Sequence, residues 1–200
     1  MVIGITGGIG SGKSAVVEIL KGKGLPVLSA DAISHEIMTP GSEVVERLAS
    51  VFGADILVGE ERALDRKCLA DKAFARPENT AKLNEIVQNA IRTELTDRMT
   101  VLKYRDPEQL IIVEIPLLYE AGWDDLCDKV WCITASEKVR ISRVMQRDGL
   151  SRRQAKMRVK RQMDEGEKTA KADVVIYNEG SMEELNEKVE KALQYMRTEK

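Results

Sequence analysis

Aromatic side chains are scarce in this 200-residue sequence, where Phe, Trp and Tyr together make up 4% of the residues. This scarcity argues against a surface that stacks bases, of the kind that proteins use to bind single-stranded nucleic acid. The formal net charge of -2 at pH 7 also argues against a general nucleic-acid binder, although local basic patches are compatible with it. We therefore expect no nucleic-acid partner.

Cysteines are few, and long apolar runs are lacking. The three cysteines, Cys68, Cys127 and Cys132, are odd in number and form no C-x-x-C pair, a pattern typical of reduced thiols in the cytosol. No apolar run approaches the roughly 20 residues of a membrane span, and the N-terminus has no basic stretch of the kind that begins a signal peptide. We expect a cytoplasmic protein with no membrane partner.

The overall composition is that of an ordinary globular protein, with 43% hydrophobic and 32% charged residues. A chain of this length can bury one core and can also carry inserted lobes. We expect a single domain that forms a monomer or a weak homo-oligomer.

Residues 7–14, with the sequence GGIGSGKS, fit the pattern G-x-x-x-x-G-K-[ST]. The β-branched apolar stretch at residues 1–5 precedes them and predicts a buried strand. A helix is predicted after them, because apolar residues recur there at helical spacing. A strand, a glycine loop and a helix are the context in which this pattern binds phosphates. The apolar helix positions are Val16, Val17, Ile19 and Leu20.

The chemistry of a polyphosphate explains the spacing of this motif. Glycines let the backbone wrap around the phosphates and turn its N–H groups inward, and the positive end of the helix dipole then faces the anion. We predict that Lys13 reaches the β- and γ-phosphates of ATP and that the Ser14 hydroxyl ligates Mg²⁺. The residues expected to bind the nucleotide here are Gly8, Ile9, Gly10, Ser11, Gly12, Lys13, Ser14 and Ala15.

Strand and helix signals alternate along the chain, which favours an α/β fold with a parallel sheet between two layers of helices. Five segments are nearly continuous in Val, Ile and Leu, as strands buried on both faces are. The predicted strands cover residues 2–6, 26–29, 110–115, 129–134 and 173–177.

A long insertion separates the second predicted strand from the third. The predicted core comprises residues 1–30, 105–148 and 170–200, whereas residues 31–104 show helical signals and no obvious strand. We interpret residues 31–104 as an inserted helical lobe that contains one long amphipathic helix. The apolar positions of that helix are Leu83, Ile86, Val87, Ile91, Leu95, Met99 and Leu102.

A shorter insertion covers residues 149–169. The pair Asp148-Gly149 ends one helix, and Ser151 with Gln154 predicts a capping box at the start of the next. That next helix carries a run of basic residues. A solvated helix face is the ordinary interpretation of such a run, but its place between two core elements favours a mobile lid over the nucleotide.

This order of parts is typical of nucleoside-monophosphate-type kinases. The sequence has neither the N-K-x-D motif of a GTPase nor an L-S-G-G-Q-like signature of a transport ATPase. Kinases of this kind bind the phosphoryl acceptor on the inserted lobe. Their lid closes to exclude water, which would otherwise hydrolyse the nucleotide.

Further motifs narrow the choice, because the chain resembles the dephospho-coenzyme A kinase family over essentially its whole length. The phosphate loop alone is generic, whereas the segments PLLYE at residues 116–120 and ADVVIYN at residues 172–178 are far more specific. The other shared motifs are Ala30-Asp31, Pro40-Gly41, Phe52-Gly53, Leu64-Asp65-Arg66, Leu83-Asn84, RVMQRD at residues 143–148 and Gln162-Met163.

The resemblance implies a P-loop NTPase fold and a specific reaction. The γ-phosphoryl group of ATP would pass to the ribose 3′-hydroxyl of dephospho-coenzyme A, in the last step of coenzyme A biosynthesis. The resemblance also implies that Asp31 accepts the hydroxyl proton, that Arg143 and Arg147 lie near the phosphates, and that Asn178 lies near the adenine ring. ATP, Mg²⁺ and dephospho-coenzyme A are the expected ligands.

Several of these assignments have alternatives. Asp31 follows the second strand at the edge where open α/β sheets bind ligands, but it could instead be a helix N-cap. Arg143 and Arg147 lie one helical turn apart, and could instead be surface arginines that pair with acids. Asn178 could simply form a turn. Glu114 could contact the Mg²⁺ shell through water, or it could position the acceptor.

The chain departs from the family pattern at a few positions, none of which is Lys13, Ser14 or Asp31. These departures bear on affinities more than on the reaction. We expect a local structural role for the only histidine, His35. The departures are Ala15, Ser29, Gln88-Asn89 and Arg140.

Two other functions stay open. One is a kinase of the same architecture that acts on another small molecule or nucleotide. The other is a nucleotide-binding module without turnover, against which the intact Lys13, Ser14 and Asp31 argue.

Overall fold

The computed structural model describes the backbone of residues 1–198 and the side chains of residues 1–196. The chain divides into two compact units. The core unit comprises Met1–Leu28 together with the described residues from Asp106 onward, and the helical unit comprises Ser29–Arg105. Each unit is described by itself below.

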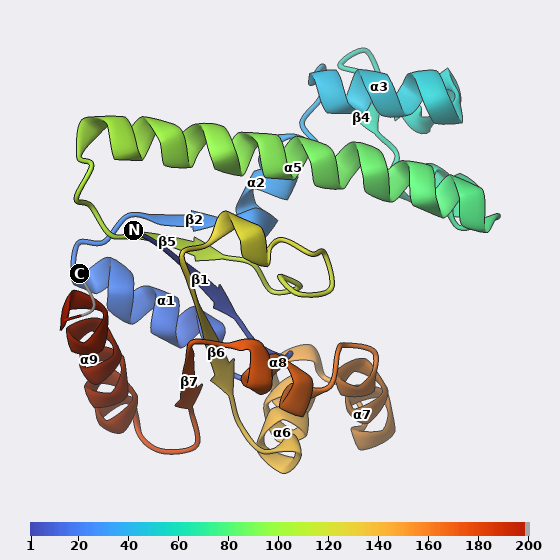
Figure 1. Cartoon of the computed structure of the whole chain (residues 1–200). Coiled ribbons are helices and arrows are strands. Elements are labelled where there is room, and N and C mark those ends of the chain that lie inside the picture. Colours follow the sequence, from blue (N-terminus) through green and yellow to red (C-terminus); the bar gives the residue numbers. More distant parts are fainter. Residues whose placement is uncertain (199–200) are drawn as a thin grey trace. The chain divides into compact units, whose positions relative to one another are not determined.

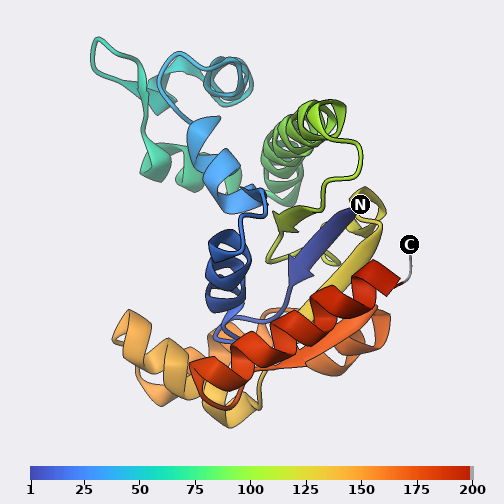
Figure 2. The same ribbon diagram turned by 90° about the vertical axis from the view of Figure 1, so that its left-hand side faces the viewer.

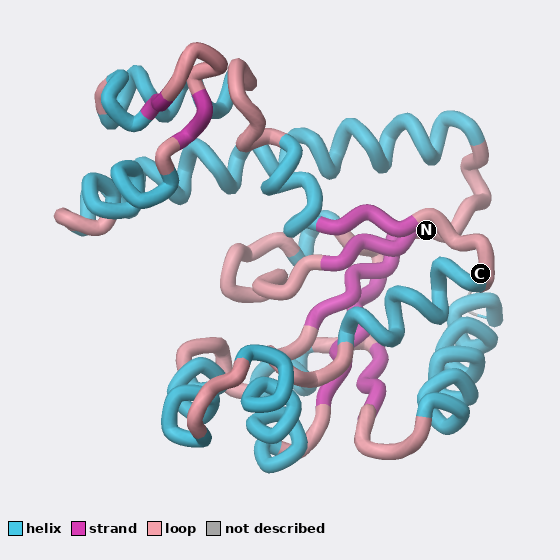
Figure 3. The backbone as a smooth tube through the Cα atoms, turned by 180° about the vertical axis from the view of Figure 1, so that it is seen from behind, coloured by secondary structure: helices cyan, strands magenta, loops and turns pink. Residues whose placement is uncertain are grey.

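A five-stranded parallel sheet forms the centre of the core unit (Figure 3). Its strand order is β2-β5-β1-β6-β7. The predicted parallel sheet with flanking helices is confirmed, and each predicted strand lies within one residue of the observed bounds. The strands are β1 Val2–Thr6, β2 Val27–Ser29, β5 Ile111–Glu114, β6 Lys129–Thr134 and β7 Val174–Tyr177.

The central strand β1 explains why these segments lack polar alternation. All five of its residues are buried, because it has a neighbouring strand on each side and is covered on both faces. Ile5 lies opposite Glu114 of β5 and Trp131 of β6. The parallel register therefore brings the carboxyl ends of β1, β5 and β6 to the same edge of the sheet, where ligands of such sheets bind.

Helices α1 (Lys13–Gly22) and α9 (Met182–Thr198) pack together on one face of the sheet (Figure 2). Val17 and Leu20 of α1 and Val189 of α9 belong to the same buried cluster as Ile3 and Trp131. The remaining elements of the core unit are η2 Asp124–Leu126, α6 Glu137–Asp148, α7 Arg152–Lys160 and α8 Glu165–Lys171 (Figure 1).

The predicted break between α6 and α7 is confirmed. Helix α6 ends at Gly149, whose φ of 64° lies in the left-handed region that glycine tolerates. Ser151 then caps α7, and both hydrogen bonds of its capping box with Gln154 are present. The two helices pack together through buried apolar side chains, among them Val144 and Val159.

The helical unit contains the predicted long amphipathic helix, α5, which spans Pro77–Arg105. Its buried side chains include Ile86, Ile91 and Leu95, which the apolar periodicity of the sequence indicates. No helix within residues 1–198 is long and apolar enough to cross a membrane. The other helices of the unit are α2 Ala30–Glu36, α3 Glu43–Phe52, η1 Ala54–Ile56 and α4 Arg66–Ala73.

The expectation that residues 31–104 hold no strand is wrong. Two short strands, β3 Leu57–Val58 and β4 Ala63–Leu64, form an antiparallel hairpin. Gly59 and Arg62 both have positive φ values in the connecting turn. Strands of two residues are too short for alternation of apolar and polar residues to reveal them.

Replacing Leu20 by alanine should lower the free energy of unfolding by about 2–5 kcal/mol. Leu20 is fully buried in the cluster that α1 and α9 form with the sheet, so truncation leaves a cavity there. Urea unfolding measures the loss. Lys21→Ala is the control, since the side chain of Lys21 is exposed, and its effect should stay within about 0.5 kcal/mol. Equal effects of the two variants would contradict this packing.

Candidate functional site

The loop between β1 and α1 presents backbone N–H groups at the start of a helix. Gly12 caps α1 with a φ of 93°, in the left-handed region, and any side chain at this position would collide with Asn178. The first amides of a helix have no acceptor within the helix. Among residues 1–198, no acceptor reaches the amides of Gly10, Gly12 and Ser14. The loop is therefore a ready anion-binding site.

Side chains hold the carbonyl groups of this loop. The Asn178 Nδ2 donates to the Ser11 carbonyl at 2.9 Å. The Arg143 Nη1 donates to the carbonyls of Gly10 and Ser11, at 3.3 Å each. The Lys13 Nζ donates to the carbonyls of Gly7, at 2.7 Å, and Gly8, at 3.3 Å. With these carbonyls engaged, the amides are the loop groups that face a ligand.

The structure thus brings two of the sequence-predicted residues, Asn178 and Arg143, to the phosphate loop. Asn178 follows β7 and is buried, and its own N–H donates to the Thr134 carbonyl at 2.8 Å. Its side chain points to the loop rather than serving only the turn that follows. Arg143 is half-buried on α6.

A buried ion pair lies against the loop at Gly8. Arg140 is 6% exposed and pairs with Glu165 of α8. A side chain at Gly8 would place its Cβ 2.6 Å from a carboxylate oxygen of Glu165, so it would have to displace this ion pair. Burial lowers the pKa of the Arg140 guanidinium. The sequence does not single out Glu165, because its partner lies 25 residues away on another helix.

A second contact missed from the sequence joins the loop to the chain that follows α7. The Ile9 N–H donates to the Gln162 Oε1 at 2.6 Å. Gln162 and Glu165 belong to residues 162–168, which we call the return segment. The sequence marks Gln162 only through the resemblance, since nothing in its local pattern indicates a contact with Ile9.

Glu120 holds the return segment at two points. Its Oε1 accepts a hydrogen bond from the Met163 N–H at 3.1 Å and pairs with the Lys168 Nζ at 2.7 Å. Lys168 is fully buried. Burial by itself raises the pKa of Glu120, but the hydrogen bonds from Lys168 and from backbone amides outweigh it, and the pKa lies below the ordinary value.

Arg147 lies away from these contacts. Its side chain is 62% exposed, and its guanidinium pairs with Asp148 at 2.7 Å. Arg158 of α7 pairs with the same carboxylate at 2.8 Å. The hydrogen bond from Arg147 lowers the pKa of Asp148. In this conformation Arg147 follows the alternative that the sequence leaves open, a surface arginine paired with an acid.

Asp31 is the second residue of α2, in its first turn, and its side chain is exposed. Ser29 is the N-cap residue of α2, so the alternative that Asp31 caps this helix is wrong. The His35 Nδ1 lies 2.8 Å from the Asp31 carbonyl, one turn further along. This contact agrees with a local structural role for His35.

The two candidate Mg²⁺ ligands stand on separate elements of the core unit. The Ser14 hydroxyl is exposed in the first turn of α1, and Glu114 ends β5 half-buried. Within residues 1–198, no group of three or more His, Cys, Asp or Glu side chains could hold a metal ion. A protein-only metal cage is therefore absent from the described residues.

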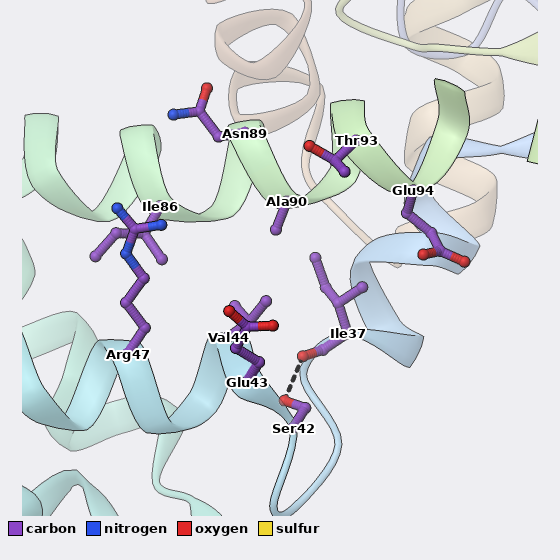
Figure 4. Close-up of a pocket in the computed structure, with 10 residues that line it drawn as sticks. All are labelled: Ile37, Ser42, Glu43, Val44, Arg47, Ile86, Asn89, Ala90, Thr93 and Glu94. Atoms are coloured by element: carbon purple, nitrogen blue, oxygen red, sulfur yellow. Dashed lines mark hydrogen bonds between the residues drawn. The ribbon is translucent and has the colours of Figure 1, made fainter. Parts of the chain in front are cut away.

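The helical unit contains a pocket of about 370 Å³ between α3, α5 and the residue that follows α2 (Figure 4). Ala90 of α5 points towards α3, and Ile37 points towards α5 from the end of α2. The Ser42 hydroxyl donates to the Ile37 carbonyl at 2.6 Å and helps to hold that wall.

Comparisons with known proteins give consistent results over nearly the whole chain. A family model described as dephospho-CoA kinase matches residues 1–184. The dephospho-CoA kinase of Syntrophotalea carbinolica is 41% identical over 189 residues, which cover 94% of this chain and 89% of that protein. The dephospho-CoA kinase from Campylobacter jejuni aligns in structure with a TM-score of 0.74 at 32% identity, covering 98% of this chain and 96% of that one. TT1252 from Thermus thermophilus aligns with a TM-score of 0.78 at 36% identity, covering 100% and 97%.

Replacing Glu120 by glutamine should lower the free energy of unfolding by about 3 kcal/mol, because it leaves the buried Lys168 without its charge partner. The Glu120 side chain is 24% exposed, so solvent screening keeps this loss at the low end for a buried pair. Glu167→Gln, an exposed change on the same α8 helix, is the control and should change little.

The pH dependence of unfolding gives an independent check on this pair. A lowered carboxyl pKa means that the stabilisation is complete above the ordinary pKa of 4.5 and is lost as the pH falls through the lowered value. Urea unfolding between pH 7 and pH 3 should therefore show a steeper acid loss in the unmodified protein than in Glu120→Gln. Parallel curves would contradict the role of this carboxylate.

Proposed function

Because this chain belongs to the dephospho-CoA kinase family, we propose that it transfers the γ-phosphoryl group of ATP to the ribose 3′-hydroxyl of dephospho-coenzyme A. The product is coenzyme A, and the reaction is the last step of coenzyme A biosynthesis. The observation that supports this most is the loop before α1, whose amides have no acceptor at Gly10, Gly12 and Ser14. Amides at a helix N-terminus are the groups that hold a polyphosphate.

The proposed nucleotide site follows the loop. Residues 8–15 surround the β- and γ-phosphates, with the amides of Gly10, Gly12 and Ser14 as donors. Lys13 leaves the carbonyls of Gly7 and Gly8 to reach the same phosphates. Asn178 borders the adenine ring while it holds the Ser11 carbonyl. Arg143 adds a positive charge beside the loop.

The proposed transfer is an in-line displacement. The bond between the γ-phosphorus and the bridging oxygen to the β-phosphate breaks, and a bond from the γ-phosphorus to the 3′-oxygen forms. Asp31 accepts the proton of that hydroxyl. Lys13 and Arg143 stabilise the charge on the equatorial oxygens. Arg147 joins them when the lid closes and its pairing with Asp148 is exchanged for a phosphate.

We assign Mg²⁺ to Ser14 and Glu114. The exposed Ser14 hydroxyl and the half-buried Glu114 carboxylate offer one or two protein oxygens, and Mg²⁺ in phosphoryl-transfer sites takes its remaining ligands from phosphates and water. When bound, the ion neutralises charge on the β- and γ-phosphates. The donor set therefore fits this ion.

The parts of the chain have separate roles in this proposal. Residues 31–104 bind the acceptor, residues 149–169 form the lid, and the remainder is the kinase core.

A monomer or a weak homo-oligomer in the cytoplasm, without nucleic-acid or membrane partners, is sufficient for the reaction. A kinase of the same architecture with another acceptor is the alternative, and product analysis separates the two.

The position of the new phosphate tests the proposed function. After turnover with ATP, Mg²⁺ and dephospho-coenzyme A, coupling between phosphorus-31 and the ribose protons in the product should place the phosphate on the 3′-oxygen. A phosphate on the 2′-oxygen, or an unmodified ribose despite ATP consumption, would contradict the proposal.

Replacing Asp31 by asparagine should lower kcat by about 10²–10⁴, because the amide cannot accept the hydroxyl proton. Steady-state ADP release with dephospho-coenzyme A measures the loss. The control is Asp71→Asn, which removes an exposed carboxylate from the same helical unit and should leave kcat unchanged. Near-normal turnover of a folded Asp31→Asn protein would refute the assignment.

Two substitutions of Gln162 should change the affinity for ATP in opposite directions: alanine should raise it and glutamate should lower it. The Gln162 Oε1 occupies the Ile9 amide, so ATP must displace it. Gln162→Ala should bind ATP about two- to tenfold more tightly, which corresponds to one ordinary hydrogen bond. Gln162→Glu should bind ATP more weakly, because a carboxylate holds the amide more strongly and repels the triphosphate.

Calorimetric titration with ATP measures both variants of Gln162. Gln194→Ala removes an exposed glutamine from α9 and is the control, with unchanged affinity. A merely structural role of Gln162 would weaken binding in both of its variants, and that result would rule out the competition.

A further inference from the structure

The pocket of the helical unit lies next to α2, the helix that carries Asp31. Asp31 is in the first turn of α2, and Ile37, which lines the pocket, directly follows its last residue. The two positions are six residues apart, which corresponds to about 9 Å along the helix axis. A ligand whose reacting hydroxyl lies at Asp31 therefore needs a long arm to reach the pocket.

Four apolar and six polar or charged residues line the pocket, and apolar atoms make up most of the surface that faces its space. Ile37, Val44 and Ile86 line it together with Ala90, and Ala90 contributes only a methyl group to its wall (Figure 4). The Thr93 hydroxyl adds a polar group on the α5 side. Apolar walls with a few polar groups, at a volume above about 300 Å³, are typical of sites for small organic ligands.

The charges at the pocket disfavour an anion. Glu43 and Glu94 line it with only one cation, Arg47, and Glu94 already pairs with Arg98 at 2.7 Å. With Glu94 paired, Glu43 and Arg47 balance each other, so a phosphate group placed here would meet no surplus of positive charge. The pocket therefore suits an uncharged, partly apolar chain with amide groups.

We propose that this pocket binds the pantetheine arm of the acceptor. The inference rests on the proposed function, since it takes dephospho-coenzyme A as the acceptor and Asp31 as the site of its 3′-hydroxyl. In that molecule the ribose and the pyrophosphate separate the hydroxyl from an uncharged arm that has two amides and a dimethyl group. The pocket is a specificity subsite that distinguishes this acceptor from a plain adenine nucleotide.

The test places a larger side chain in the pocket by substituting one residue of its wall. Ala90→Leu adds three carbons that project into the space, and it should raise the KM for dephospho-coenzyme A about tenfold or more. The KM for ATP should not change, because the phosphate loop belongs to the core unit. Ala81→Leu is the matched control: it is the same substitution on α5, at an exposed position nine residues away and so on the opposite side of the helix. It should leave both KM values unchanged.

Free pantetheine provides a second readout. It should inhibit the unmodified protein and Ala81→Leu in competition with dephospho-coenzyme A, and should not inhibit Ala90→Leu at the same concentration. If thermal unfolding shows that Ala90→Leu is destabilised, Thr93→Val carries the test as a change of nearly equal volume. Its KM for dephospho-coenzyme A should rise a few-fold.

Two failures are distinguishable in this experiment. An unchanged KM for dephospho-coenzyme A in Ala90→Leu and Thr93→Val, with normal turnover of the unmodified protein, would overturn the pantetheine subsite alone. Absence of acceptor-dependent turnover in the unmodified protein would instead overturn the proposed function on which the subsite rests.

Discussion

The hydrogen bonds that Asn178 and Arg143 donate to the carbonyls of the phosphate loop are the interaction on which the rest of the site depends. Every peptide unit of the loop has a donor and an acceptor, and a tight loop could turn either inward. Because side chains from α6 and from the residue that follows β7 hold the carbonyls on one side, the amides at the start of α1 remain for an anion. The parallel sheet supports this arrangement, because it brings the carboxyl ends of β1 and β7 to the same edge of the sheet.

The return segment is the part of the predicted lid that contacts this loop. Gln162 contacts Ile9, Glu165 pairs with the arginine packed on Gly8, and the buried Lys168 pairs with Glu120. Buried ion pairs of this kind contribute little net stability but strongly penalise any arrangement that separates them. In our account they make the position of the lid sensitive to what occupies the loop. ATP binding and lid movement are then one coupled equilibrium.

Much of the architecture follows from local sequence signals. The strand bounds are correct to within one residue because buried parallel strands are continuous apolar runs, and α5 is revealed by the period of Ile86, Ile91 and Leu95. The phosphate loop is identified by its own spacing, and Ser151 and Gln154 form the expected capping box. In each case the deciding interactions lie within a few residues along the chain.

The missed features depend on contacts between distant parts of the chain. Gln162 and Ile9 are 153 residues apart, and no periodicity records such a pair. The pairing of Arg140 with Glu165 likewise depends on how α6 and α8 are placed around Gly8. The β3–β4 hairpin was missed because each of its strands has only two residues. Local patterns thus predict the elements, whereas the supports of the site require the three-dimensional structure.

Acceptor-dependent product formation tests the central claim most directly. ADP release from ATP and Mg²⁺ is measured with and without dephospho-coenzyme A, while mass spectrometry follows the acceptor. Our account predicts ADP release that requires dephospho-coenzyme A, with an equal amount of product heavier by one phosphate. ADP release that does not depend on dephospho-coenzyme A, from a folded protein that binds ATP, would contradict the proposed acceptor.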